Sequence, residues 1–309
     1  CAKYLMMQCS DQTELISEDI QKRCPATEEA IPQLDVKKIL KDKLPSLNDT
    51  AAGVIAWFLR RIVHEEEANS VYRKFGKLHG LDFANALIYD YFNISVDVIG
   101  AENLPTNSDL IFASNHPIGS IDGIALITVL AKHYKSLKIP VNDMLLNIKN
   151  LSEFFIPVNK VKGAGSDQRN MSSLLNEALG SDAPVLFFPA GQCSRKQPDG
   201  TVKDNEWKKT FISKAKEYKR NVVPIYFHGK NSNLFLNLAY YRNKLGIKAN
   251  IEMILLAHEM FNKKDEKFTV VIGEPIAYSS FDNSKSDREW ADAVKKHSYE
   301  LSGKLGDGI

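Results

Sequence analysis

The spacing of apolar residues along the chain changes near residue 94. Before that position apolar residues recur every three to four positions, which is typical of amphipathic helices. After it, short apolar runs alternate with helical stretches. We expect strands at 95–100, 110–114, 138–141, 154–158, 184–188, 222–227, 250–256 and 267–272. We expect helices at 122–134, 167–180, 205–219 and 233–245. This alternation predicts an α/β fold with a central, mostly parallel or mixed sheet flanked by helices.

The same pattern divides the chain into four parts. Residues 1–34 are polar and lack an apolar period, so we expect a loosely ordered leader there. Residues 35–93 form a predicted N-terminal helical region, and residues 94–278 form the α/β domain. Residues 279–309 have helical spacing, which predicts a C-terminal helix packed on the domain.

The strongest amphipathic helix of the N-terminal region begins near Asn48 and Asp49, which can cap it. The apolar face of this helix is broad. The helix also carries Trp57, with Arg60 and Arg61 near its C-terminal end. Helices that lie in a bilayer interface use these residue types. Two interpretations remain open: the helix packs on the core of the domain, or it contacts a membrane surface.

The composition is that of an ordinary globular protein, with 44% hydrophobic and 25% charged residues among 309. The net charge of +2 argues neither for nor against nucleic acid as a partner. We do not expect nucleic-acid binding, because no recognised nucleic-acid-binding module accompanies the cations. No run approaches the roughly 18 apolar residues that a membrane-spanning helix needs. The four cysteines lack the spacing of metal ligands, so we expect reduced thiols and no metal site.

The most informative stretch is 114–123, Ser-Asn-His-Pro-Ile-Gly-Ser-Ile-Asp-Gly. His116 comes where a strand would end, and Asp122 comes where the next helix would begin. Histidine accepts a proton near neutral pH, and a carboxylate on its Nδ1 leaves Nε2 free to do so. The pair is therefore a candidate general base, although a His and an Asp that only cap a helix would have the same spacing.

A second loop, 187–195, follows another predicted strand and reads Phe-Phe-Pro-Ala-Gly-Gln-Cys-Ser-Arg. Ligands bind at the carboxyl edge of open α/β sheets. Gly191 would allow a ligand close to the backbone, and Ser194 and Arg195 can hydrogen-bond an anionic oxygen. Cys193 would be a nucleophile only if its thiol pKa were lowered, and nothing in the sequence requires that.

The motif Asn-His-Pro-x-Gly-x-x-Asp-Gly, which begins at Asn115, resembles the signature of the glycerolipid acyltransferases, the lysophosphatidic acid acyltransferase superfamily. That family has four residues between the His and the Asp, whereas this chain has five. The longer form is similar to a bacterial branch called hemolysin-like, which includes lyso-ornithine-lipid and lyso-glycine-lipid O-acyltransferases. The resemblance implies substrate-binding roles for Asn115, Gly119 and Ser120 beside the catalytic pair.

Three more blocks follow in the family's order. The loop 187–195 resembles the family's Phe-Pro-Glu-Gly-Thr-Arg-Ser block, which binds the acceptor's phosphate or headgroup. Here Ala190 and Cys193 replace the Glu and the Arg, which implies an acceptor other than a plain glycerol-3-phosphate type, with Arg195 in place of the lost cation. The segment 156–160, Ile-Pro-Val-Asn-Lys, resembles the family's third block, which implies that Asn159 or Lys160 contacts an anionic headgroup or the donor's phosphates. The fourth, 222–225, would form a wall of the acyl pocket.

A basic segment, 207–220, carries six cations against one acid at helical spacing. It is either a solvated outer face or a surface for anionic lipid headgroups or an acidic carrier protein.

The resemblance implies an O-acyltransferase that moves a fatty acyl chain to the hydroxyl of a lyso-lipid, either a lysophospholipid or a lyso-lipid with an amino-acid headgroup. An acyl-carrier-protein or coenzyme A thioester would be the co-substrate, with no cofactor or metal. His116 would remove the hydroxyl proton, Asp122 would orient the imidazole, and backbone N–H groups near Gly119 and Gly191 would stabilise the oxyanion.

We expect a cytoplasmic protein that lies on the inner, anionic face of the cell membrane. A lipid hydrolase that uses water as acceptor and a non-enzymatic lipid-binding module are the alternatives.

Overall fold

The structure, a computed structural model, describes residues 34–43, 46, 48–142, 145–157, 171–247 and 251–305. Its central sheet has the strand order β1-β9-β8-β2-β5. The bounds are β1 (Ser95–Ile99), β2 (Leu110–Ser114), β5 (Val185–Phe187), β8 (Asn221–His228) and β9 (Lys267–Ile272). β8 and β9 are antiparallel, and all other neighbours are parallel. The predicted α/β class with a mostly parallel or mixed sheet is confirmed.

Two smaller strand pairs lie beside this sheet. β3 (Ile139–Val141) and β4 (Phe155–Pro157) are parallel to each other. Lys138, just before β3, exchanges backbone hydrogen bonds with the strand β5 region, donating to Pro184 and accepting from Leu186. The pair therefore continues the sheet past β5. The antiparallel pair β6 (Arg195–Lys196) and β7 (Val202–Lys203) was not expected from the sequence.

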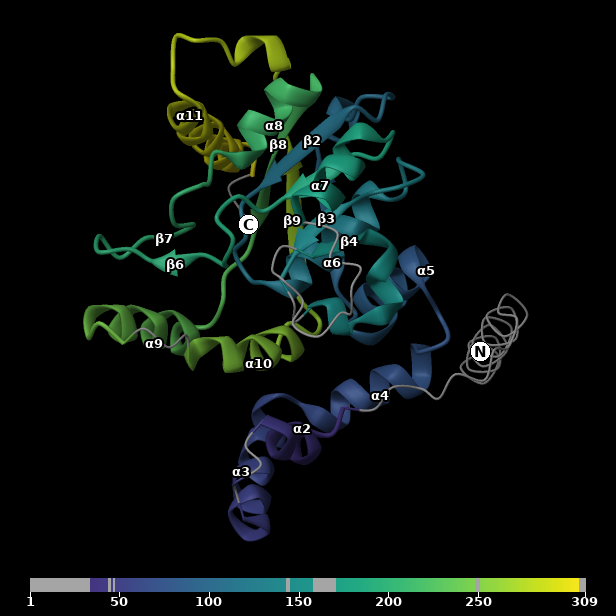
Figure 1. The fold of residues 1–309 in the computed structure, drawn as a ribbon, viewed down its shortest axis with the longest axis vertical. Coiled ribbons are helices and arrows are strands. Elements are labelled where there is room, and N and C mark those ends of the chain that lie inside the picture. Colours follow the sequence, from purple (N-terminus) through teal and green to yellow (C-terminus); the bar gives the residue numbers. More distant parts are fainter. Residues whose placement is uncertain are drawn as a thin grey trace, which may run out of the picture.

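Helices cover both faces of the sheet, and side chains of β2 alternate between the two layers. Leu110 and Phe112 pack in the core with α4 (Glu65–Phe75), α5 (Gly80–Asn85), the π-helix η1 (Ala86–Tyr91) and α6 (Ser120–Leu130). Ile111 and Ala113 pack in the opposite core with α7 (Met171–Gly180), α8 (Thr210–Tyr218) and α11 (Asp287–Glu300). Figure 1 shows α8 and α11 at one end and α6 with α5 toward the other side. Both faces of β2 are thus buried, as its unbroken apolar run predicts.

The N-terminal helices α2 (Val36–Lys43) and α3 (Asp49–Ile62) extend away from the sheet (Figure 1). The Asn48 side chain caps α3 by accepting the Ala51 N–H. The side chains of Val54, Trp57 and Phe58 on α3 are 66%, 62% and 59% exposed. The apolar face of α3 is therefore largely uncovered.

Helices α9 (Asn233–Lys244) and α10 (Leu255–Phe261) form a further layer below the sheet in Figure 1. A 3-10 helix, η5 (Ile251–Ile254), precedes α10, so the strand expected at 250–256 is wrong. The period of a short apolar run does not distinguish a strand from a buried helix. Here Glu252 is fully buried in the middle of the run and pairs with two arginines, Arg195 and Arg242.

The remaining short 3-10 helices are η2 (Ala101–Asn103), η3 (Leu145–Asn147), η4 (Lys149–Phe154), η6 (Tyr278–Ser280) and η7 (Leu301–Lys304). Among the helices in the described ranges, none has both the length and the apolar character needed to cross a membrane.

Candidate active site

His116 lies just past the carboxyl end of β2, between the parallel neighbours β5 and β8. The strand pairing of β2 ends at Ser114, and Pro117, which has no N–H to donate, cannot extend it. Gly119 has φ +131°, a backbone conformation that other residues rarely adopt, and α6 begins at the next residue. The chain thus turns sharply from strand to helix and leaves the histidine at the carboxyl edge of the sheet.

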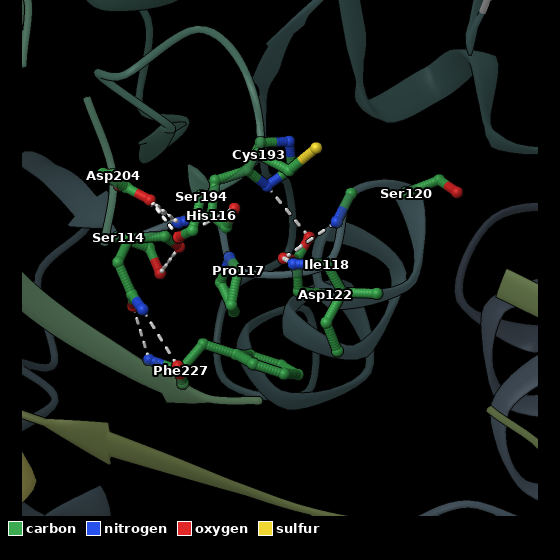
Figure 2. A network of polar contacts seen from close by, with 12 residues as sticks. Ser114, His116, Pro117, Ile118, Ser120, Asp122, Cys193, Ser194, Asp204 and Phe227 are labelled. Atoms are coloured by element: carbon green, nitrogen blue, oxygen red, sulfur yellow. Dashed lines mark hydrogen bonds and ion pairs between the residues drawn. The ribbon is translucent and has the colours of Figure 1, made fainter. Parts of the chain in front are cut away.

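Asp122, in the first turn of α6, contacts the imidazole of His116. Its Oδ1 is 3.0 Å from His116 Nδ1, and its side chain is fully buried. Its Oδ2 accepts the backbone N–H groups of Ile118 at 2.9 Å and Gly119 at 3.2 Å, as the dashed lines in Figure 2 show. The carboxylate is therefore fixed through both oxygens, and His116 Nε2 makes no hydrogen bond within the described part of the chain.

A second carboxylate, Asp204, holds the main chain of His116. The His116 N–H lies 3.2 Å from both Asp204 oxygens, and the same carboxylate accepts Ser194 Oγ at 2.6 Å and Trp207 Nε1 at 2.9 Å. The Ser194 N–H in turn donates to the His116 carbonyl at 2.7 Å. Figure 2 shows Asp204 and Ser194 on one side of His116 and Asp122 on the other.

Burial and charge act in opposite directions on His116. Burial lowers the pKa of the imidazole, but the carboxylates of Asp122 and Asp204 raise it by more, so the net pKa lies above the ordinary value. Burial raises the pKa of Asp204, although hydrogen bonds from Ser194 and Trp207 oppose that shift.

A cavity of about 300 Å³ opens beside His116. Its wall is mostly aliphatic and aromatic: α6, β3, β4, the end of β5 and the start of α8 contribute Ile124, Ile127, Ile139, Phe155, Phe188 and Phe211. The Phe188 ring lies 4.2 Å from the His116 ring, centre to centre. The site thus places a proton acceptor at the wall of an apolar cavity whose volume lies at the lower end of the range for ligand pockets.

The model of a family described as acyltransferase matches residues 38–308 of the chain. The chain belongs to the acyltransferase family. Two relatives named lyso-glycine lipid O-acyltransferase, from Phocaeicola vulgatus and Bacteroides thetaiotaomicron, are each 40% identical to it. The matches cover 90% and 89% of this chain and 98% and 100% of the relatives.

A solved structure, the 1-acyl-sn-glycerophosphate acyltransferase of Thermotoga maritima, is 16% identical, with a TM-score of 0.45 over 88% of this chain and 89% of that one.

The resemblance seen in the first motif is thereby confirmed, both for the superfamily and for the branch with lyso-glycine lipid O-acyltransferases. This acyltransferase is an enzyme of the O-acyltransferase type.

The structure brings some of the predicted binding residues of the acyltransferase to the cavity. Gly119, Ser120 and Gly191 line it together with His116. Asn115 does not; its amide exchanges two hydrogen bonds with the backbone of Phe227, at 2.6 and 2.9 Å, and so fixes β2 to β8. Asn159 and Lys160 lie outside the described residues.

Ser194 and Arg195 also do not line the cavity. Ser194 is buried on Asp204, and Arg195 is only 4% exposed, with its guanidinium 3.2 Å from Glu252 and 2.7 Å from the Cys193 carbonyl. The structure therefore does not place Arg195 where it could replace the cation of the family's block. Burial raises the pKa of the Cys193 thiol, which opposes a role as nucleophile.

Two residues at the site were not singled out from the sequence. Asp204 has no motif around it, and it contacts His116 through a backbone N–H, which leaves no trace in the residue pattern. Lys208 lines the cavity. It belongs to the basic segment 207–220, and the charge of that segment was the signal in the sequence that could have identified Lys208. Within the described residues, no group of His, Cys, Asp and Glu side chains has the arrangement of a metal site.

Proposed function

We propose that the acyltransferase moves a fatty acyl chain from an acyl-carrier-protein or coenzyme A thioester to the hydroxyl of a lyso-lipid with an amino-acid headgroup. The observation that carries this proposal is the imidazole of His116, held by a buried carboxylate at the wall of an apolar cavity. The names of the two relatives at 40% identity support a glycine headgroup. The Ala190 and Cys193 replacements support an acceptor without the usual phosphate.

In the mechanism that we propose, His116 Nε2 takes the proton of the acceptor hydroxyl while Asp122 stabilises the imidazolium. The hydroxyl oxygen attacks the thioester carbonyl, forming the new ester bond. The C–S bond breaks, and the thiol leaves with the proton from the imidazolium. No acyl-enzyme is needed, and the nearby candidates are unsuited as nucleophiles: Ser194 is buried and does not line the cavity, and the Cys193 thiol has a raised pKa.

Among the backbone N–H groups near Gly119 and Gly191, those of the two glycines themselves are already used. The Gly119 N–H already donates to Asp122, and the Gly191 N–H donates to the Phe188 carbonyl at 2.9 Å. Ser120 begins α6 and lines the cavity, and the first N–H groups of a helix have no acceptor within it. We therefore assign the oxyanion contact to the Ser120 N–H.

We also propose that the enzyme works at the inner face of the cell membrane, in the cytoplasm, with α3 in contact with the anionic surface. The exposed Val54, Trp57 and Phe58 favour lipid contact over packing on the domain. Arg61 lies 5.7 Å from the centre of the Trp57 ring, so a cation accompanies the aromatic face.

The test is incubation of the purified enzyme with a labelled acyl thioester and a hydroxyl-bearing N-acylglycine, followed by mass spectrometry of the lipids. We expect a diacyl product, and we expect His116→Ala to lower its rate of formation about a thousandfold because the general base is lost. Free fatty acid in place of the diacyl product would indicate a hydrolase. Neither product would indicate a binding module. Unchanged transfer by His116→Ala would refute the mechanism.

A further inference from the structure

Besides the titratable His116, Lys208 is the one residue with a charged side chain among the described residues that line the cavity. It lies just before α8 and is exposed. Its backbone N–H donates to the Pro189 carbonyl at 3.0 Å, which ties it to the loop after β5. Its Nζ lies over Gly191, 3.1 Å from the point where a Cβ would be. The absence of a side chain at Gly191 therefore leaves the ammonium room at the cavity.

The ammonium of Lys208 makes no ion pair within the described part of the chain. The other cation near this loop, Arg195, is committed to the buried Glu252 and to the Cys193 carbonyl. A free cation at the rim of an apolar cavity is a binding group for an anion on an otherwise apolar ligand.

One loop fixes Lys208 relative to His116. The Pro189 carbonyl holds the Lys208 backbone, and five residues later the Ser194 N–H holds the His116 carbonyl. The backbones of Lys208 and His116 are therefore tied to the same loop, which keeps the base of the lysine side chain and the proton acceptor on the same side of the cavity.

We infer that Lys208 binds the carboxylate of the acceptor headgroup and so selects an acidic acceptor. This inference rests on the proposed function. A glycine joined to a fatty chain through its amine keeps a free carboxylate. The hydroxyl on the fatty chain would reach His116 while the ammonium of Lys208 holds that carboxylate. The cation of Lys208 takes the place that the sequence assigned to Arg195.

The experiment compares two acceptors that differ only in charge: an N-acylglycine with a hydroxyl on its acyl chain, and the methyl ester of the same compound. Each is assayed with wild type, Lys208→Ala, Lys208→Arg and the control Lys209→Ala, which alters a neighbouring exposed lysine that does not line the cavity. KM for the acyl donor is measured in parallel.

For Lys208→Ala we expect kcat/KM for the carboxylate acceptor to fall about tenfold, the size of one charge-assisted hydrogen bond at a partly exposed site. The methyl ester should change by less than about twofold, the donor KM should not change, and Lys208→Arg should restore most of the loss.

An equal loss for acid and ester, a raised donor KM, or no loss at all would overturn the assignment of Lys208. A raised donor KM would place the donor's phosphates at the ammonium instead. If the wild type transfers an acyl chain to neither acceptor, the proposed function itself is refuted. This outcome is distinct from a failure of the Lys208 assignment, which is judged by comparing the variants.

Discussion

Two buried carboxylates act on one histidine from different sides. Asp122 contacts the imidazole, and Asp204 holds the backbone N–H of the same residue. Both also raise the pKa of His116 against the effect of burial. Asp122 fixes the ring, whereas Asp204 fixes the main chain and, through Ser194, the loop beside the cavity. We therefore regard Asp204 as a positioning residue, because it acts on the site through His116 and not on the substrate.

This arrangement predicts a pH dependence. In the proposed mechanism the neutral imidazole is the base, so kcat/KM should rise with pH through the pKa of His116, which lies above its ordinary value of 6.5. Asp204→Asn removes one of the charges that raise this pKa, so the rising limb should move to lower pH, and kcat should fall about tenfold or more as the backbone support weakens. The measurement is kcat/KM against pH for both proteins.

The control for this experiment is Asp199→Asn, which alters an exposed carboxylate near the β6-β7 pair and should leave the profile unchanged. A limb that stays in place in Asp204→Asn would contradict the electrostatic role of Asp204, whatever happens to kcat.

The contact between His116 and Asp122 was predictable from the sequence because both residues belong to one short strand–turn–helix segment. Asp204 was not, because it lies 88 positions from His116 and bonds to its main chain. Arg195 was predictable in part. Its place in the loop after β5 follows from the sequence, but its burial does not, because that burial depends on Glu252, 57 positions away. Residue type and spacing carry local geometry, whereas pairing between distant segments depends on how the whole chain packs.

At the scale of elements, the described strands at the centre of the sheet match the apolar runs because both their faces are covered. The wrong strand prediction at 250–256 also comes from burial, because an apolar run indicates burial more directly than it indicates backbone conformation. Helix α3 has an apolar face that the domain leaves uncovered. Four of its large apolar residues are exposed, Val54, Ile55, Trp57 and Phe58, and the proposed contact with a membrane surface would remove them from water.

The double variant Trp57→Ser/Phe58→Ser should lower the binding of the enzyme to vesicles with anionic lipids roughly tenfold or more, because it removes most of the apolar area that would enter the interface. Co-sedimentation with vesicles measures this. Activity toward a short-chain, water-dispersed acceptor should stay the same, since α3 does not line the cavity. Undiminished vesicle binding would contradict the role of α3.

At the scale of the whole molecule, a buried ion-pair cluster joins the layer of α9 and η5 to the loop beside the site. Glu252 is fully buried; it lies 3.2 Å from the guanidinium of Arg195, at β6, and 2.7 Å from that of Arg242, on α9. Such a cluster adds little net stability compared with an apolar core, but loss of one partner leaves uncompensated buried charge.

We therefore expect Glu252→Ala to lower the free energy of unfolding by about 3–5 kcal/mol, because two arginines lose their counter-charge. Urea denaturation followed by circular dichroism measures the change. Glu300→Ala, which removes a 57% exposed carboxylate on α11, is the matched control and should change stability by less than about 1 kcal/mol. Equal stability of the two variants would show that the cluster is not coupled to folding.

The double restraint on Asp122 has a stereochemical consequence. With one oxygen on the ring and the other on two backbone N–H groups, the carboxylate keeps the imidazole facing a single direction. A secondary alcohol whose carbon carries two different chains is chiral, and we expect only one of its mirror-image forms to direct O–H at Nε2 while its tail fills the apolar cavity and its head points the opposite way. A racemic acceptor should therefore be consumed to half, leaving the other enantiomer in solution.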